Sequence, residues 1–212
     1  MLTALLASAM ILGASDRGIQ QSSWGWFEED GDLVCKIMGE SDHVQWGQWG
    51  SVDSDATMPY SAHTNGLNGD TSVNQIYVAA AKEWNKVSCS DFRFMYDNPT
   101  IASRSVPSND GRPHIKFQGG QGWLAACWLI YGGGGNRECD IEIEPDYNWY
   151  IGTGNPGWQQ FDLYSVVVHE LGHAFGLDHS SDSSAIMWPY ISNGTKNRVP
   201  TQDDQNGICA LY

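Results

Sequence analysis

Apolar and polar residues alternate in several short segments between residues 56 and 144. Successive side chains of an extended strand point to opposite faces, so this alternation predicts half-buried strands. The pattern is clearest where Cys139, Ile141 and Ile143 alternate with acidic residues, which predicts a strand with one carboxylate-rich face. A longer apolar run, Trp123 to Tyr131, also predicts a strand. The predicted strands lie at residues 56–63, 92–96, 114–118, 123–131 and 139–144.

Helical spacing of apolar residues occurs at three places along the chain. The first predicted helix follows the capping residues 70–72 and carries Ile76, Ala79, Ala80 and Trp84 at helical intervals. The second begins at the N-cap Asp162 and ends at Gly176, and its apolar positions are Leu163, Val166, Val167, Leu171 and Ala174. The third opens at residues 201–204 and runs through Ile208 and Leu211. Strands first and helices later predict an α+β domain with a mixed, twisted sheet.

The N-terminal part of the chain differs from the rest. Residues 2–14 form an apolar stretch that is too short to span a bilayer and resembles the core of a signal peptide, with a buried first helix as the alternative. Residues 16–43 have an irregular pattern rich in Gly, Ser and acidic residues. We therefore predict a signal peptide at 1–15, a pro-segment or N-terminal arm at 16–43, and a catalytic domain at 44–212.

The charge of the chain limits its partners. The sequence has 25 acidic and 11 basic side chains, a formal charge of −14. Such a surface repels phosphate backbones and anionic lipid headgroups, so we expect neither a nucleic acid nor a membrane surface as partner. A protein or peptide substrate is compatible with this charge. We expect the chain to be a monomer.

Five cysteines are spread along the chain without a CxxC pair. Their spacing argues against a thiolate zinc site and indicates disulfide bonds formed in an oxidising compartment. Cys127 and Cys139 flank a glycine turn and are the first expected bridge, while Cys89 with Cys209 is another pairing. Cys35 is another of the five cysteines. Because five is an odd number, one cysteine must remain outside any set of intramolecular bridges.

The segment 169–180 reads HELGHAFGLDHS and carries the chemistry of the chain. His169 and His173 are four residues apart on the predicted helix, so both imidazoles lie on one face and can bind one zinc ion. Gly176 permits the left-handed backbone that ends the helix and turns the chain back, which brings His179 to the same ion. Three protein ligands leave a coordination position for water, as in catalytic zinc sites. Glu170 lies near enough to act on that water as a general base.

This segment, HExxHxxGxxH, followed by residues 184–190 (SAIMWPY), resembles the motif and methionine turn of metzincin zinc peptidases. Ser180 after the third histidine, the Trp-Pro-Tyr after Met187 and the terminal QDDQNGI at 202–208 are similar to the matrixin branch, the matrix-metalloproteinase-like peptidases. The resemblance covers roughly residues 44–212 and is strongest from Phe161 to Pro189.

The resemblance implies a secreted, extracellular zinc-dependent endopeptidase with an active-site helix and a C-terminal helix. It implies hydrolysis of peptide bonds by a zinc-activated water with Glu170 as base, and Met187 as a packed floor beneath the histidines. A catalytically inactive secreted zinc-binding module is the alternative. We expect the substrate to lie along an exposed strand at residues 122–127 and the loop 188–200 to shape the pocket beyond the cleaved bond.

Two features of many matrixins are missing from the sequence. The latency motif PRCGxPD is absent, so Cys35 is left either as a thiolate that blocks zinc or as a disulfide partner or free thiol. The histidine-rich loop of a second zinc site is also absent, which predicts one zinc ion. The oxygen atoms of Glu144 and Asp146 are of the kind that calcium binds, and exposed strand carboxylates are the alternative.

Overall fold

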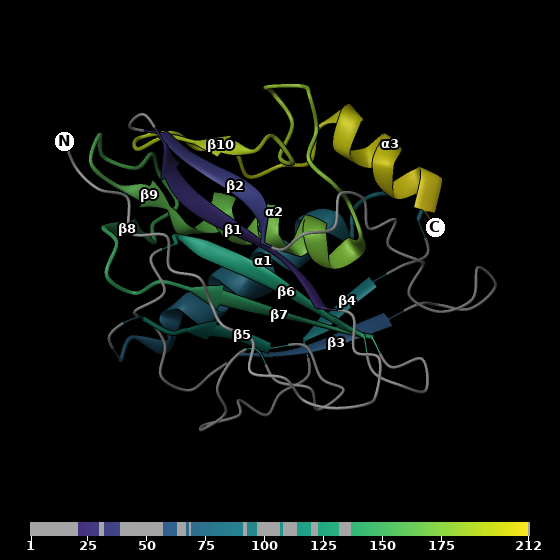
Figure 1. Ribbon diagram of the computed structural model, residues 1–212, viewed down its shortest axis with the longest axis horizontal. Helices are drawn as coiled ribbons and strands as arrows, with labels where there is room; N and C mark the ends of the chain where they lie inside the picture. The colour runs from purple at the N-terminus through teal and green to yellow at the C-terminus, as the bar shows by residue number, and fades with distance from the viewer. Residues whose placement is uncertain are drawn as a thin grey trace.

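A mixed sheet of eight strands forms the centre of the molecule in the computed structural model (Figure 1). The model describes residues 21–29, 32–38, 57–62, 67, 69–90, 93–96, 107, 114–119, 123–131 and 137–211. The strand order is β10-β2-β1-β6-β7-β5-β3-β4, and a separate two-stranded sheet pairs β8 with β9. The pairs β5–β7, β3–β5 and β3–β4 are parallel and the others in the large sheet are antiparallel. The α+β class with a mixed sheet is therefore as predicted.

Strands β3 to β7 agree with the segments that the sequence predicted as strands, and five further strands were not predicted. They are β1 (Gln21–Glu29), β2 (Asp32–Met38), β3 (Thr57–Ala62), β4 (Arg93–Tyr96), β5 (His114–Phe117), β6 (Ala125–Tyr131), β7 (Arg137–Ile143), β8 (Trp149–Tyr150), β9 (Phe161–Asp162) and β10 (Tyr190–Ile191). On β7 the side chains of Cys139, Ile141 and Ile143 join the hydrophobic core. The alternate residues on this strand are the carboxylates predicted for its other face, and Asp140 and Glu142 are also buried.

The irregular pattern of residues 16–43 does not predict the two strands found there. β1 and β2 form an antiparallel hairpin in which Phe27 pairs with Val34, and β1 then pairs with β6. On the other side, β2 pairs with β10, so the hairpin lies between two strands that are far away in sequence (Figure 1). The predicted signal peptide at 1–15 lies outside the described residues.

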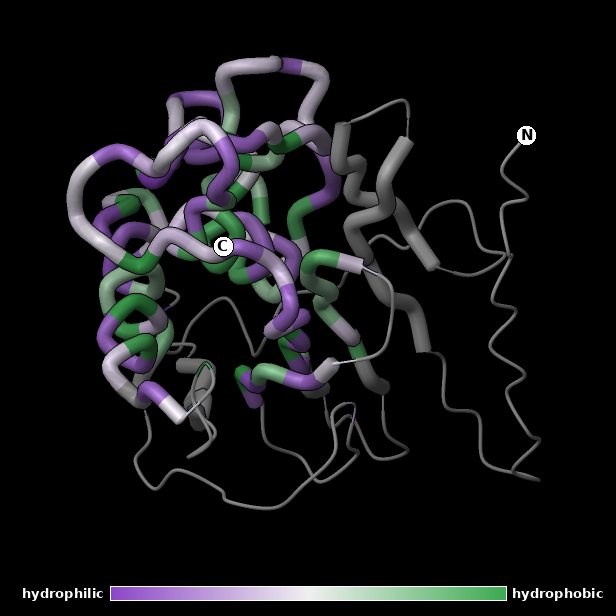
Figure 2. Tube along the Cα trace, turned by 90° about the vertical axis from the view of Figure 1, so that its left-hand side faces the viewer, coloured by the Kyte–Doolittle hydropathy of each residue, from purple (hydrophilic) through white to green (hydrophobic). Residues whose placement is uncertain are grey.

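Helices α1 (Asn74–Trp84) and α2 (Leu163–Phe175) lie next to each other behind the sheet (Figure 1). A short 3-10 turn (Thr71–Val73) precedes α1, and Asp70 Oδ1 accepts a hydrogen bond from Ser72 N, as the capping pattern predicted. The buried Trp84 connects the helices, because its Nε1 donates to Val168 O at 2.8 Å and its ring packs on Phe175. In Figure 2 hydrophobic and hydrophilic residues follow one another along the coiled segments of the tube.

Helix α3 (Gln202–Leu211) closes the described chain and is attached to the body by a disulfide bond between Cys89 and Cys209. The expected bridge between Cys127 and Cys139 is not formed in the structure. These two sulfur atoms lie 2.6 Å apart, buried on β6 and β7. Their strands place Cys127 opposite Ile141 and Cys139 opposite Leu129, so the two cysteines are diagonal neighbours.

The core lies between the sheet and the two long helices. Its largest fully buried side chains include Trp84, Tyr77, Phe175, Leu124 and Leu163. Nearly every residue of α2 is buried, so this helix is enclosed by the rest of the fold. Among the described helices, none combines the length and the hydrophobicity that a membrane span needs.

Candidate functional site

The start of α2 is fixed by Asp162, as the sequence predicted. Asp162 has an extended backbone, and its side chain accepts a hydrogen bond from Ser165 N at 3.0 Å. This bond satisfies one of the backbone N–H groups that the first turn of a helix leaves without a partner. The helix then continues without interruption to Phe175, which puts His169 and His173 one turn apart.

The end of α2 delivers the third histidine. Gly176 adopts a left-handed backbone with φ of 102°, which glycine reaches without the steric cost of a Cβ atom. The backbone N–H groups of Gly176 and Leu177 donate to His173 O and Gly172 O, and so close the last turn. The chain reverses there and His179 reaches the other two histidines, as predicted.

The three imidazole rings converge in space. Their ring centroids are separated by 4.7, 5.4 and 4.9 Å, and one nitrogen from each lies within 4.8 Å of the others. His169 Nδ1 donates to Ile186 O at 2.7 Å and His173 Nδ1 donates to Leu177 O at 2.9 Å, because a carbonyl can only accept. The proton of each neutral ring is therefore on Nδ1, and the lone pair is on Nε2.

These lone pairs need a shared cation. His169 Nε2 and His173 Nε2 face each other at 3.0 Å, although both are acceptors. Zinc–nitrogen bonds of about 2.0–2.1 Å at a tetrahedral angle would separate two such atoms by about 3.3 Å. The donor set, the spacing and the carbonyl-fixed tautomers therefore fit one zinc ion. In the part of the chain that the structure describes, the group of His, Cys, Asp or Glu side chains that could hold a metal ion consists of His169, His173 and His179.

Burial keeps the histidines neutral. It lowers the pKa of His169 to about 4 and that of His179 to about 2, and it lowers the pKa of His173 well below its ordinary value. The neighbouring imidazoles lower the pKa values of His173 and His179 further. Metal ligands must be deprotonated, so the site is prepared to bind a cation at neutral pH.

Glu170 follows His169 on α2 and is fully buried. A carboxylate can accept a proton from water and return it, which is the chemistry of a general acid–base group. The structure therefore brings together the three predicted histidines, His169, His173 and His179. Glu170 lies on the same helix, and its role as the base stays a prediction.

A buried carboxylate that sequence reasoning did not single out supports the turn behind the histidines. Asp204 on α3 accepts hydrogen bonds from Ile186 N at 2.9 Å and Met187 N at 3.0 Å. Met187 is buried and packs against α2 at Gly172, where an added methyl group would overlap Met187 Sδ and Trp84. This contact agrees with the floor position expected for Met187. The terminal QDD motif contained the signal for Asp204, but spacing alone did not show its partner.

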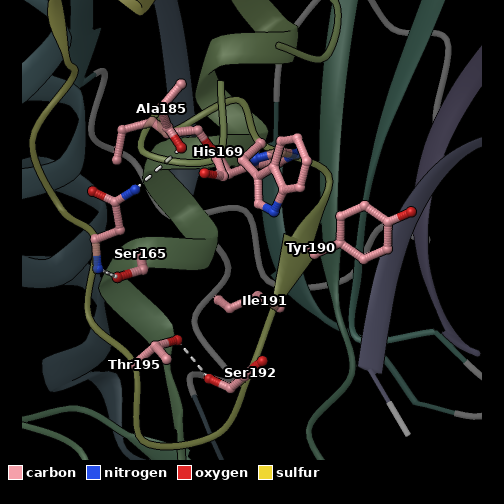
Figure 3. A pocket seen from close by; sticks show the side chains of 11 residues that line it. Ser165, His169, Ala185, Tyr190, Ile191, Ser192 and Thr195 are labelled. Atoms are coloured by element: carbon pink, nitrogen blue, oxygen red, sulfur yellow. Dashed lines mark hydrogen bonds between the residues drawn. The ribbon is translucent and has the colours of Figure 1, made fainter. Parts of the chain in front are cut away.

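A pocket opens next to His169, and the loop 188–200 forms much of its wall. Figure 3 shows Ser165 and His169 on α2 facing Tyr190 and Ile191 across this pocket. Its volume is about 230 Å³, and its lining residues are Ser165, His169, Ser183, Ala185, Ile186, Trp188, Tyr190, Ile191, Ser192, Thr195 and Asn197. An apolar cavity of about 150 Å³ already holds benzene, so this pocket has room for a large side chain.

The predicted substrate strand at 122–127 is not an open edge. β6 begins at Ala125, and both of its sides are paired, one with β7 and the other with β1. Gly25 pairs with Ala126 and Trp24 with Cys127, so the N-terminal hairpin occupies part of the expected binding edge. The expectation of an exposed strand is therefore wrong over residues 126–127. Its cause is a pairing between segments about 100 residues apart, which local patterns do not encode.

The acidic face of β7 was predicted, but the burial of its carboxylates was missed by sequence reasoning. Burial raises the pKa of Glu142 to about 7, although Trp128 Nε1 and Gln118 Nε2 both donate to its carboxylate. Farther along, Glu144 is buried and Asp146 is exposed, with Asp146 N donating to Glu144 Oε1 at 3.4 Å. Calcium at Glu144 and Asp146 stays a prediction.

The comparison with known families agrees with this geometry. The family model described as matrixin, Peptidase M10, matches residues 49–212. The chain belongs to the matrixin family. Its relatives include a hatching enzyme of Paracentrotus lividus, which is 31% identical over 163 residues (76% of this chain and 26% of that protein). Interstitial collagenase B of Mus musculus is 33% identical over 141 residues (66% of this chain, 28% of that protein).

A bacterial matrixin relative covers more of the chain. Karilysin of Tannerella forsythia is 29% identical over 184 residues, which are 83% of this chain and 36% of that protein. The chain thus spans between about a quarter and a little over a third of the length of these three relatives.

Proposed function

We propose that this matrixin is a zinc-dependent endopeptidase that hydrolyses peptide bonds of extracellular proteins. The observation that carries the proposal is the convergence of three neutral imidazoles, two of which are oriented by backbone carbonyls, beside a buried carboxylate. His169, His173 and His179 would hold one zinc ion. When bound, zinc supplies a Lewis acid that polarises the scissile carbonyl and makes the attacking water more acidic.

Glu170 supplies the proton transfer in this proposal. Its carboxylate takes a proton from the attacking water and returns it to the nitrogen of the departing amine. The pocket beside His169 receives the substrate side chain that follows the cleaved bond.

The test compares wild type with Glu170→Gln, which keeps the size of the side chain and removes the base. Zinc content by atomic spectroscopy and circular dichroism serve as controls for binding and folding. We expect Glu170→Gln to bind zinc and to lose about 10²–10⁴-fold in kcat on a gelatin-derived peptide. Chelation of zinc should abolish cleavage in wild type. A wild type that holds zinc but cleaves neither gelatin nor casein would favour the inactive zinc-binding module.

The hairpin of β1 and β2, which pairs with β6, gives a second prediction for this function. A peptide backbone can pair with residues 126–130 only when β1 has left them, since β1 occupies that side of the strand. We expect Ser23→Pro, which removes a backbone N–H within β1, to lower KM for peptides. The matched control is Ser41→Pro, the same change at a serine that follows Met38, the last residue of β2, in the sequence. An unchanged KM in Ser23→Pro would show that the hairpin does not compete with substrate.

The proposal includes secretion. The leader-like residues 1–15 and the acidic, cysteine-containing composition support it. N-terminal sequencing of protein recovered from the medium of expressing cells would determine where the mature chain begins and would test the boundaries at 15 and 43.

A further inference from the structure

One hydroxyl connects the pocket with a carboxylate behind its wall. Ser165 lines the pocket on α2, and its Oγ donates to Asp162 Oδ2 at 2.6 Å. The same Oγ accepts a hydrogen bond from Asn197 N at 2.8 Å. Asp162 has no exposed surface. Its negative charge therefore lies one hydrogen bond behind the pocket lining.

Arg198 pairs with this carboxylate through both of its oxygens. Nε donates to Asp162 Oδ2 at 2.7 Å, and Nη2 donates to Asp162 Oδ1. Nη2 also donates to Gly152 O at 2.8 Å, and the guanidinium lies over the ring of Tyr164 with Cζ 4.9 Å from its centroid. A guanidinium with two parallel bonds to a carboxylate has a fixed position, so Arg198 is held rigidly behind the pocket.

The position of Arg198 also fixes the pocket wall. The preceding residue, Asn197, lines the pocket, and its Nδ2 donates to Ala185 O at 3.1 Å and Ser184 O at 3.3 Å. Asn197 is thereby bonded to the start of α2 through Ser165 and to the segment before Met187. Apart from His169, the residues that line the pocket are uncharged. The charge balance near the pocket therefore depends on the pair behind it.

We propose that Asp162 and Arg198 determine the specificity of this pocket, because their mutual neutralisation makes it select uncharged substrate side chains. The inference rests on the proposed peptidase function and assigns these two residues a positioning and electrostatic role outside the reacting atoms. A charge left without its partner in a poorly solvated place attracts an opposite charge strongly. Removal of one partner should therefore change which side chain the pocket accepts.

The experiment uses the full chain and peptides that differ only in the residue after the cleaved bond: leucine, alanine, lysine or glutamate. The readout is kcat/KM for each peptide. In Arg198→Met the carboxylate of Asp162 loses its partner, and we expect the lysine-to-leucine ratio of kcat/KM to rise about tenfold, equivalent to about 1.4 kcal/mol. In Asp162→Asn, which keeps an N-cap side chain, we expect the glutamate-to-leucine ratio to rise instead.

The double variant, Asp162→Asn with Arg198→Met, separates charge from structure. It buries no unpaired charge, so both ratios should return close to their wild-type values. Should Arg198→Met fail to fold by circular dichroism, Asp162→Asn and the double variant still decide the matter. Equal losses for all four peptides in the single variants, or ratios that the double variant does not restore, would overturn the inference.

Failure of the proposed function has a different result. A zinc-loaded wild type that cleaves none of the four peptides would overturn the peptidase proposal and this inference with it. A wild type that cleaves them, with ratios that do not change in Asp162→Asn or Arg198→Met, would overturn the role of the pair alone.

Discussion

Two buried aspartates support the two sides of the candidate active site, and their charges are balanced in different ways. Asp162, at the start of α2, is paired with the guanidinium of Arg198. Asp204, on α3, accepts hydrogen bonds from neutral donors: the backbone N–H groups of Ile186, Met187 and Thr201 and the hydroxyl of Thr201. Both carboxylates are at most 2% exposed.

Asp162 and Asp204 also differ in which part of the site they hold in place. Asp204 fixes Ile186, and Ile186 O in turn accepts a hydrogen bond from His169 Nδ1, so this carboxylate indirectly orients His169. Asp162 fixes the pocket wall through Ser165. Backbone N–H groups cannot move away from a lost acceptor, whereas Arg198 keeps Gly152 O and the ring of Tyr164 as partners when Asp162 is lost. We therefore expect the structure to be more sensitive to loss of Asp204 than to loss of Asp162.

The largest effect is expected for Asp204→Ala. It leaves the buried N–H groups of Ile186 and Met187 without acceptors, and we expect the free energy of unfolding to fall by about 3–5 kcal/mol. Zinc affinity should fall about 10–100-fold because His169 loses its orientation. Denaturant unfolding and zinc titration measure the two quantities. Asp203→Ala, which removes an exposed neighbouring carboxylate, is the matched control and should change stability by less than about 1 kcal/mol.

The next largest effect is expected from loss of the disulfide bond that attaches α3, the helix that carries Asp204. Cys89 and Cys209 are 120 residues apart in sequence, so their bond restricts a long loop of the unfolded chain. We expect Cys89→Ser with Cys209→Ser to lower the free energy of unfolding by about 2–4 kcal/mol. An unfolding midpoint equal to that of wild type under non-reducing conditions would contradict the role of this bond.

Glu142 extends the comparison to a third buried carboxylate, whose charged form is disfavoured. Its pKa is raised to about 7 from an ordinary value of 4.5, so the folded state binds more protons than the unfolded state between these pH values. Stability from this group is complete below about pH 4.5 and decreases as the pH rises to about 7. Relative to wild type, Glu142→Gln should therefore gain about 2 kcal/mol in free energy of unfolding between pH 4.5 and 8. A constant difference across this range in urea unfolding would refute the raised pKa.

The smallest effect is expected for Asp162→Asn. Asparagine caps helices as well as aspartate does, and Arg198 retains Gly152 O as a partner, so we expect a loss of about 1 kcal/mol. Asp162→Ala also removes the cap and should lose about 1 kcal/mol more. Thermal unfolding of the two variants measures the difference. If Asp162→Asn costs as much as Asp204→Ala, the contrast between the two aspartates is wrong.

Much of the metal site could be predicted from the sequence because its geometry is local. A separation of four residues puts His169 and His173 on one face of a helix, and Gly176 permits the reversal that brings His179 back. The helix boundaries at Asp162 and Gly176 follow from side-chain and backbone capping, which act over a few residues. The third helix and the five strands β3 to β7 were found for the same reason.

The sequence by itself determined the three converging histidines, the helix that carries two of them and the α+β class, since these depend on short-range periodicity and capping. Only the tertiary structure decided which distant groups became partners: β1 with β6, Cys89 with Cys209, Asp204 with the turn at Met187, and Arg198 with Asp162. Strand alternation shows which face is buried but not which strand lies alongside, and a cysteine or carboxylate does not encode its partner. These choices depend on packing of the whole chain, which brings together groups separated by 17 to 120 residues.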